Sequence, residues 1–197
     1  VFSPVIKQEG DMSVRQALLN IGLEEDDEFI TLHPGTSKVE RSWHVERFGV
    51  LCQKILKSDK KKLVLLGTKS EENILNRIKS YCPPGQIKVT PPMNLRVLAG
   101  VLKKSRIFIG NDSGMMHLAA MVGTPIVGIF GPGNPKTTGP YMDAKYYEIL
   151  TKNYSCSPCR QHFFKECKPS PHNKPYCLED ITVKNVHDAL HRLLKRV

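Results

Sequence analysis

The residues best suited to chemistry stand together in the block Asn111-Asp112-Ser113-Gly114. An apolar run at residues 107–109 precedes this block, and a segment rich in Met, Leu and Ala follows it. This order predicts a strand, a tight turn and the N-terminus of a helix, where free N–H groups and the positive end of the dipole attract anions. Asp112 or Ser113 can cap the helix, and Gly114 lets a ligand approach the backbone closely. The block therefore predicts a phosphate or diphosphate site.

Strands and helices are expected to alternate along the chain. Apolar runs predict strands at residues 29–32, 63–66, 87–89, 107–109, 126–130 and 146–150. Helical patterns are expected at residues 13–20, 43–56, 70–81, 95–103, just after Gly114, and at 183–194. Ser13 with Gln16 is expected to form a capping box, and Asn94 and Thr182 are expected to be N-caps. Continuously apolar strands between helices predict an α/β, Rossmann-like parallel sheet with helices on both faces.

In such a sheet, ligands bind outside the carboxyl ends of the strands. The segments expected at that rim are residues 33–37, 67–72, 90–94, 111–117 and 131–136. Two common nucleotide motifs are absent from them. No G-x-G-x-x-G follows the first strand, which argues against an NAD-type dehydrogenase, and Pro135 stands where a P-loop has glycine before its lysine, which argues against a kinase or NTPase.

The composition fits one globular domain that binds something anionic. Of 197 residues, 40% are apolar, and 29 Lys and Arg against 19 Asp and Glu give a formal net charge of +10. The basic residues are scattered, so nucleic acid is not an expected partner. No apolar run is long enough to span a membrane, and the first residues lack a signal-peptide pattern. The chain starts at Val1 in an extended-looking stretch, and we interpret it as a fragment of a longer protein.

Several motifs together resemble the ADP-heptose:lipopolysaccharide heptosyltransferases, glycosyltransferase family 9. The resemblance extends from Phe29 to Val197, including the late cysteines, and corresponds to the C-terminal, donor-binding domain of a GT-B enzyme. It implies that residues 1–27 are a linker and short leading helix, that residues 28–197 are the nucleotide-sugar domain, and that an N-terminal acceptor domain is missing. The matching motifs are His33-Pro34-Gly35-Thr36 with Trp43, Gly67 with Glu71, Asn111-Asp112-Ser113-Gly114-x-x-His117-Leu118-Ala119-Ala120, Gly123-Thr124-Pro125, and Phe130-Gly131-Pro132.

The resemblance also implies roles for individual residues. Ser113 and Gly114 would hold the donor diphosphate through backbone N–H groups, and Gly35, Thr36 and Ser37 would line the same site. Asp112 would reach the hydroxyls of the transferred sugar, Glu71 would accept from the nucleotide ribose, and the loop around Met93 and Leu95 would border the adenine. For His117, ligand contact and a structural, partly buried role are equally expected. Without the surrounding motif, Asp112 would be predicted to be a helix N-cap. Glu71 would be predicted to be a negative charge that stabilises the positive end of a helix dipole.

Arg41 is the expected catalytic residue, as a counter-charge to the departing diphosphate. Many family members carry Lys two residues before the Trp, where this chain has Arg41, and Lys38 is the other candidate. Arginine keeps the charge but grips phosphate with a different geometry. The family inverts the sugar centre without a metal or cofactor, with a carboxylate base in the N-terminal domain. This chain is therefore expected to bind ADP-heptose or a similar donor without catalysing transfer alone.

The implied acceptor is a lipid-linked lipopolysaccharide core oligosaccharide. The implied location is the cytoplasm, with possible peripheral contact at the inner face of the inner membrane. Two alternatives remain: a non-catalytic nucleotide-binding module, and a GT-B transferase or epimerase that uses a UDP-sugar.

Four cysteines fall in a Cys/Pro-rich excursion at about residues 153–178. Cys156, Cys159, Cys167 and Cys177 have the number of thiols for a structural zinc site, but their spacing is not that of two zinc knuckles. Reduced thiols that tie down an irregular loop are favoured slightly over zinc, and no metal site is assigned.

Overall fold

The computed structural model describes residues 8–59, 61–157, 159–160 and 162–197. Its centre is a six-stranded sheet in the order β3-β2-β1-β4-β5-β6, and every neighbouring pair is parallel. The strands are β1 (Phe29–His33), β2 (Lys62–Leu65), β3 (Ile87–Val89), β4 (Ile107–Asn111), β5 (Ile126–Ile129) and β6 (Tyr147–Leu150). The predicted Rossmann-like sheet is confirmed.

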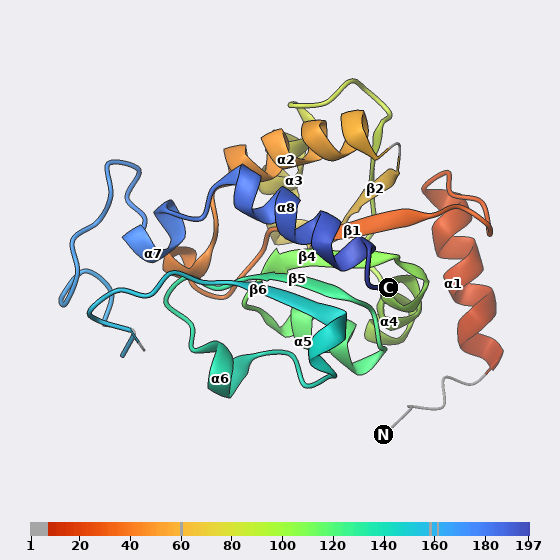
Figure 1. The fold of residues 1–197 in the computed structure, drawn as a ribbon. Helices are drawn as coiled ribbons and strands as arrows, with labels where there is room; N and C mark the ends of the chain where they lie inside the picture. Colours follow the sequence, from red (N-terminus) through yellow and green to blue (C-terminus); the bar gives the residue numbers. More distant parts are fainter. Residues whose placement is uncertain (1–7, 60, 158, 161) are drawn as a thin grey trace.

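Helices cover both faces of this sheet (Figure 1). One face carries α2 (Val45–Ser58), α3 (Glu72–Lys79) and α8 (Val183–Leu194), and the other carries α4 (Leu95–Lys104) and α5 (Gly114–Met121). The helix α1 (Gln8–Asn20) packs on α4, with Val14 and Leu18 buried. Successive strand residues point to opposite faces, so Ile30 and Leu32 join one core while Phe29 and Phe108 join the other.

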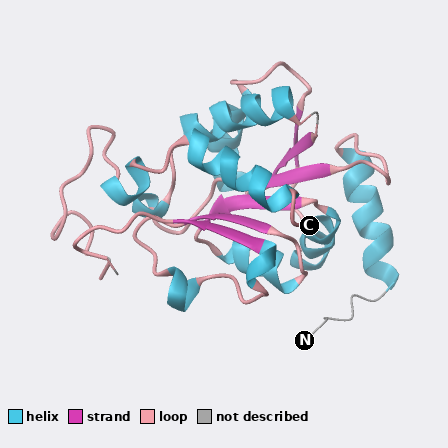
Figure 2. Ribbon diagram, viewed as in Figure 1, coloured by secondary structure: helices cyan, strands magenta, loops and turns pink. Residues whose placement is uncertain are grey.

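The order of the strands creates a switch point at the centre of the sheet. The chain runs outward from β1 through β2 to β3, then returns to place β4 on the other side of β1. The loops after β1 and β4 therefore lead to opposite faces of the sheet, and ligands of doubly wound sheets bind at such a switch point. Figure 2 shows the long loops gathered at the end of the sheet where the strands finish, on the left of the view.

Several predicted boundaries shift in the structure. Helix α1 begins at Gln8, so Ser13 lies inside it and the predicted Ser13–Gln16 capping box is wrong. The helix predicted from residue 43 begins at Val45, because Trp43 is held in the core and His44 is the N-cap. A 3₁₀ turn, Lys69–Glu71, precedes α3. The caps Asn94 and Thr182 are confirmed, since their side chains accept from the N–H groups of Val97 and Asn185.

The remaining elements are short. They are α6 (Pro135–Thr138), α7 (Tyr176–Glu179), and 3₁₀ turns at Val39–Arg41 and Ala144–Tyr146. None of the helices in the described part of the chain combines the length and the apolar character needed to cross a membrane.

Candidate functional site

The loop after β1 is held against β4 by one buried side chain, Asn111. Its Nδ2 donates to the carbonyl of Pro34 at 2.6 Å, and its Oδ1 accepts from the backbone N–H of Trp43 at 3.0 Å. Asn111 is completely buried at the end of β4. One amide therefore fixes both ends of the segment from Pro34 to Trp43, which carries four of the predicted site residues.

Glu71 reaches this loop from the 3₁₀ turn that follows β2, the strand beside β1. Its carboxylate accepts from the N–H of Thr68 at 2.8 Å, and its Oε1 lies 3.6 Å from Nε2 of His33. The His33 side chain and the Thr68 groups outweigh burial and lower the pKa of Glu71 to about 2. A Cβ added at Gly35 would lie 1.6 Å from the same Oε1, so only glycine leaves room for this carboxylate. Gly35 and Glu71 are thus brought together.

Arg41 and Asp112 pair directly with each other across the switch point. An Nη2–Oδ2 ion pair joins them, with only 17% and 6% of their side chains exposed. Asp112 is therefore not the helix cap that its position allowed. The N-cap position of α5 is Ser113, and its side chain makes no capping bond. The loop after β5 closes on the same group, since a Cβ on Gly133 would lie 2.4 Å from Oδ2 of Asp112.

Buried polar atoms without hydrogen-bond partners belong to the same segments as this ion pair. Nε2 of His44 faces Glu179 at 3.0 Å. Apart from it, four buried side-chain atoms in the described part of the chain have no hydrogen-bond partner, at the end of β1 or on the loops after β1 and β4: His33 Nδ1, Thr36 Oγ1, Arg41 Nε and Ser113 Oγ. Buried polar groups are normally paired, so each needs a partner from elsewhere. Three of the four can donate hydrogen bonds in any protonation state, which suits a ligand rich in anionic oxygen.

The start of α5 faces open space. A Cβ on Gly114 would meet nothing within 4 Å, so the backbone there is accessible. His117 is exposed one turn later, so of its two expected roles the structural, partly buried one is wrong. Met93 is half-buried against the core on the β3 side, and Leu95 is 65% exposed. Ser37 and Lys38 are exposed, and Nζ of Lys38 lies 5.6 Å from the ring centroid of Phe163 rather than beside Asp112.

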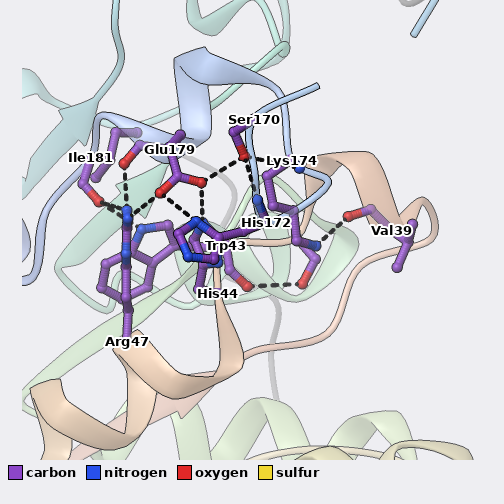
Figure 3. A network of polar contacts seen from close by, with 10 residues as sticks. Val39, Trp43, His44, Arg47, Ser170, His172, Lys174, Glu179 and Ile181 are labelled. Carbon is purple, nitrogen blue, oxygen red and sulfur yellow. Dashed lines mark hydrogen bonds and ion pairs between the residues drawn. The ribbon is translucent and has the colours of Figure 1, made fainter. Parts of the chain in front are cut away.

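A network centred on Glu179 holds the Arg41 segment from the other side (Figure 3). The carboxylate of Glu179 accepts from Arg47 at 2.5 Å and from Ser170 at 2.8 Å, and it lies 3.0 Å from Nε2 of His44. Burial would raise its pKa, but Ser170 and the charges of His44 and Arg47 hold that pKa below its usual range. Trp43 adds a bond from Nε1 to the carbonyl of Ile181 at 2.8 Å.

The residues of this network were not singled out in the sequence, apart from Trp43. Arg47 and Glu179 are 132 residues apart, and no local pattern marks them as a pair. Lys174 completes the connection by donating to the carbonyl of Val39 at 2.8 Å. The network therefore pins the segment around α7 to the turn that carries Arg41.

A cavity of about 660 Å³ lies beside this site, not in it. Its walls are the loop 131–136 after β5, the segment after β6 and α7, and all four late cysteines line it. Burial, followed by the neighbouring thiols, raises the pKa of Cys177 to about 12. Thr36, Glu71, Asp112 and Ser113 do not line the cavity, which touches the predicted site only through the loop after β5.

The family model for glycosyltransferase family 9 (heptosyltransferase) matches residues 6–168. The chain belongs to glycosyltransferase family 9. Among curated relatives of this family 9 chain, lipooligosaccharide heptosyltransferase 2 of Campylobacter jejuni is 28% identical over 178 residues. That match covers 88% of the chain and 53% of the relative. The chain thus spans about half the length of the relatives it matches.

Solved structures agree on the fold of the family 9 chain. A family 9 glycosyl transferase from Veillonella parvula superposes with a TM-score of 0.79 at 25% identity, over 97% of this chain and 53% of the other. ADP-heptose lps heptosyltransferase II of Escherichia coli gives a TM-score of 0.76 at 18% identity, over 94% and 52%. The predicted family and the predicted fold, that of one domain of a GT-B glycosyltransferase, are both confirmed.

Proposed function

We propose that this chain binds ADP-heptose or a similar nucleotide sugar in the crevice between the loops after β1 and β4. The observation that carries the proposal is the set of unpartnered buried atoms on Thr36, Arg41 and Ser113 at the switch point of the sheet. Ligands of doubly wound sheets bind at this place. The names of several relatives, which are heptosyltransferases, support the choice of donor.

The diphosphate fits the donors on the two loops. The hydroxyls of Thr36 and Ser113 would donate to phosphate oxygens, and Ser37 would add a third hydroxyl. The open backbone at Gly114 would let the diphosphate reach the first N–H groups of α5, where the helix dipole favours negative charge. His117 is exposed on the same helix and is assigned to the outer edge of this site.

Arg41 would supply the counter-charge as the nucleotide diphosphate leaves. It is favoured over Lys38 because its guanidinium already lies against Asp112, while Lys38 lies near Phe163. A guanidinium has five N–H donors, so Arg41 can keep Asp112 oriented and still bind phosphate. Asp112 has further acceptor sites for the hydroxyls of the sugar.

The nucleoside would lie on the β2–β3 side of the crevice. Glu71 is held ionised by its low pKa, so its carboxylate can accept from two ribose hydroxyls. Met93, half-buried on the loop after β3, would border the adenine. No cofactor is required for this binding.

The whole protein would be an inverting, metal-independent glycosyltransferase that transfers heptose to a lipid-linked lipopolysaccharide core acceptor in the cytoplasm. This chain would be its C-terminal, donor-binding half, and the general base would belong to the N-terminal half. The net charge of +10 suits an anionic acceptor and peripheral contact with the inner face of the membrane.

Calorimetric titration with ADP, UDP and ADP-heptose tests the donor proposal. We expect ADP to bind and UDP to bind more weakly, with the sugar adding affinity that Asp112→Ala removes. Asp26→Asn is the control, because Asp26 is an exposed carboxylate before β1, at the opposite end of that strand. A preference for UDP would overturn the choice of donor, and no effect of Asp112→Ala would overturn the proposed site.

A further inference from the structure

Three side chains that commonly bind metals meet where α2 ends against α8. Asp59 follows the last residue of α2, and His187 and His191 lie four residues apart on one face of α8. One ligand atom from each lies within 4.8 Å of the other two. This is the one such group of His, Cys, Asp or Glu that the described residues contain. It lies near the start of β2, away from the carboxyl ends of the strands.

The carboxylate of Asp59 lies near both histidine rings without a good hydrogen bond to either. Nε2 of His187 lies 3.2 Å from Nε2 of His191. Nε2 of His187 lies 3.9 Å from Oδ2 of Asp59, and Nδ1 of His191 lies 3.5 Å from Oδ1 of Asp59. The last two distances are too long for good N–H···O bonds. Ligands around tetrahedral zinc lie about 3.4 Å apart, given Zn–N and Zn–O bonds of about 2.1 Å. A small movement of side chains would let all three coordinate one ion.

We infer that Asp59, His187 and His191 form a structural site for a divalent transition-metal ion, zinc above all. Two imidazoles and one carboxylate are a ligand set typical of zinc, and a water or the hydroxyl of Ser58 would fill the fourth position. Oγ of Ser58 lies 3.1 Å from Nε2 of His187 and donates to Oδ2 of Asp59 at 2.5 Å. Ser58 thereby orients two of the ligands.

The surroundings keep the ligands available to a metal. His187 is only 6% exposed, while His191 is half-buried and gives an ion access from solvent.

The Glu179 network also brings two histidines close to one carboxylate, but it leaves no room for a metal. His44 and His172 also lie beside one carboxylate, at 3.0 Å and 3.2 Å. There, however, the guanidinium of Arg47 already occupies the carboxylate at 2.5 Å. Asp59 has no such cation paired with it among the described residues, apart from the two histidines.

A metal at this site would fasten the C-terminal end of α2 to α8. These helices cover the same face of the sheet, and α8 is the last element of the chain. An ion that binds only the folded state stabilises it in proportion to its affinity. The site would therefore hold the closing helix in place without touching the donor crevice.

The test is zinc binding by the chelator-treated chain. We expect one bound zinc and a rise in Tm of roughly 5 to 10 °C when free zinc is about 100 times its Kd. His191→Gln should remove both the bound zinc and the shift, and it should still fold because His191 is partly exposed. Asp59→Asn should weaken zinc binding at least tenfold.

Two control variants locate the ion. Cys156→Ser alters the cysteine group and His172→Gln removes an exposed histidine beside a carboxylate, and both should bind zinc like the wild type. With Co²⁺ in place of zinc, the absorption spectrum should lack thiolate charge-transfer bands. Zinc that survives His191→Gln, zinc that is lost in Cys156→Ser, or a wild-type chain that binds none would each overturn the inference.

Discussion

Gly35 and Gly114 belong to the same proposed site, yet a methyl group at the two positions meets opposite surroundings. At Gly35 it would collide with the carboxylate of Glu71, while at Gly114 it would meet nothing within 4 Å. We expect Gly35→Ala to lower the free energy of unfolding by about 1–3 kcal/mol, because the Glu71–His33 contact must shift. Gly114→Ala should leave stability unchanged within about 0.5 kcal/mol.

ADP binding should distinguish the same two variants in the opposite sense to stability, with the larger effect expected in Gly114→Ala. If phosphate oxygens approach the backbone at Gly114, the added methyl group should weaken ADP binding about tenfold although the fold is intact. Urea unfolding followed by calorimetry measures both effects. Normal ADP affinity in Gly114→Ala would show that the diphosphate binds elsewhere.

Glu71 should make stability depend on pH in the acid range. Its pKa falls from 4.5 to about 2 on folding, so the folded state binds fewer protons than the unfolded state between these values. The stabilisation is therefore complete above about pH 5 and is lost as the pH falls toward 2. We expect it to be about 1–2 kcal/mol, since the side chain is partly screened by solvent.

Glu71→Gln isolates this contribution. The difference in free energy of unfolding between wild type and Glu71→Gln should be largest at pH 7 and should shrink between pH 5 and pH 3. Glu72→Gln is the matched control, because Glu72 is exposed on the next position of the same helix start. A difference that stays constant with pH would contradict the low pKa of Glu71.

At the scale of elements, the Glu179 network joins α2, the turn before it and α7. Glu179→Gln keeps the shape of the side chain but removes its charge, so Arg47 loses its counter-charge. The NH₂ group of the new amide must also point toward Arg47 or His44, where the carboxylate oxygens now accept. We expect a loss of about 1–3 kcal/mol in the free energy of unfolding. ADP should also bind more weakly, because the turn that carries Arg41 is released.

The control for this network is Glu166→Gln. Glu166 pairs with His162 at 3.4 Å on the exposed surface of the same excursion, so its loss should change stability by less than about 0.5 kcal/mol. Urea unfolding of both variants provides the comparison. Equal stability of Glu179→Gln and wild type would show that the network does not hold these elements together.

The sequence predicts elements well where the signal is local. Five of the six predicted strands agree with the structure to within one residue at each end, because buried parallel strands are continuous apolar runs. The sixth, β4, continues two residues beyond the prediction, through Gly110 to Asn111. The caps Asn94 and Thr182 are predicted correctly because each acts on its own helix. Short α6 and α7 were missed, since four residues carry little periodicity. The predicted N-cap at Ser13 is wrong because the helix begins further toward the N-terminus, at Gln8.

Pairings between distant segments could not be predicted. Arg41 and Asp112 were assigned separate roles, but they are 71 residues apart and form one ion pair. His187 and His191 alone do not indicate a metal site, because the third ligand, Asp59, follows a different helix far away in the sequence. The sequence did predict that the loops after β1, β2 and β4 share one edge of the sheet, because the carboxyl ends of parallel strands meet there whatever the strand order. Sequence thus located the proposed site but not the contacts within it.

At the scale of the whole molecule, this chain should bind a donor and yet transfer nothing alone. The proposed donor groups lie on loops of this one sheet, while the chain spans 53% of the length of its Campylobacter relative. Transfer also needs an acceptor site and a base that activates the acceptor hydroxyl, and both are assigned to the other half. Holding donor and acceptor in line accounts for a large part of the rate of such a transfer. A chain that contains only the proposed donor site cannot do this.

We therefore expect no heptose transfer from ADP-heptose to a lipid-linked core acceptor by this chain, at donor concentrations that saturate it in calorimetry. The full-length protein, assayed by mass spectrometry of the acceptor, should transfer heptose. Arg41→Ala in it should lower kcat about 100-fold or more, because a counter-charge acts as the diphosphate departs. The same variant should also weaken donor binding, because Arg41 is one of the proposed phosphate contacts and orients Asp112. Arg77→Ala, which changes an exposed arginine on α3, is the control. Transfer by the chain alone would show that it contains its own base and acceptor site, whereas a full-length protein that binds ADP-heptose without transferring it would favour a nucleotide-binding module.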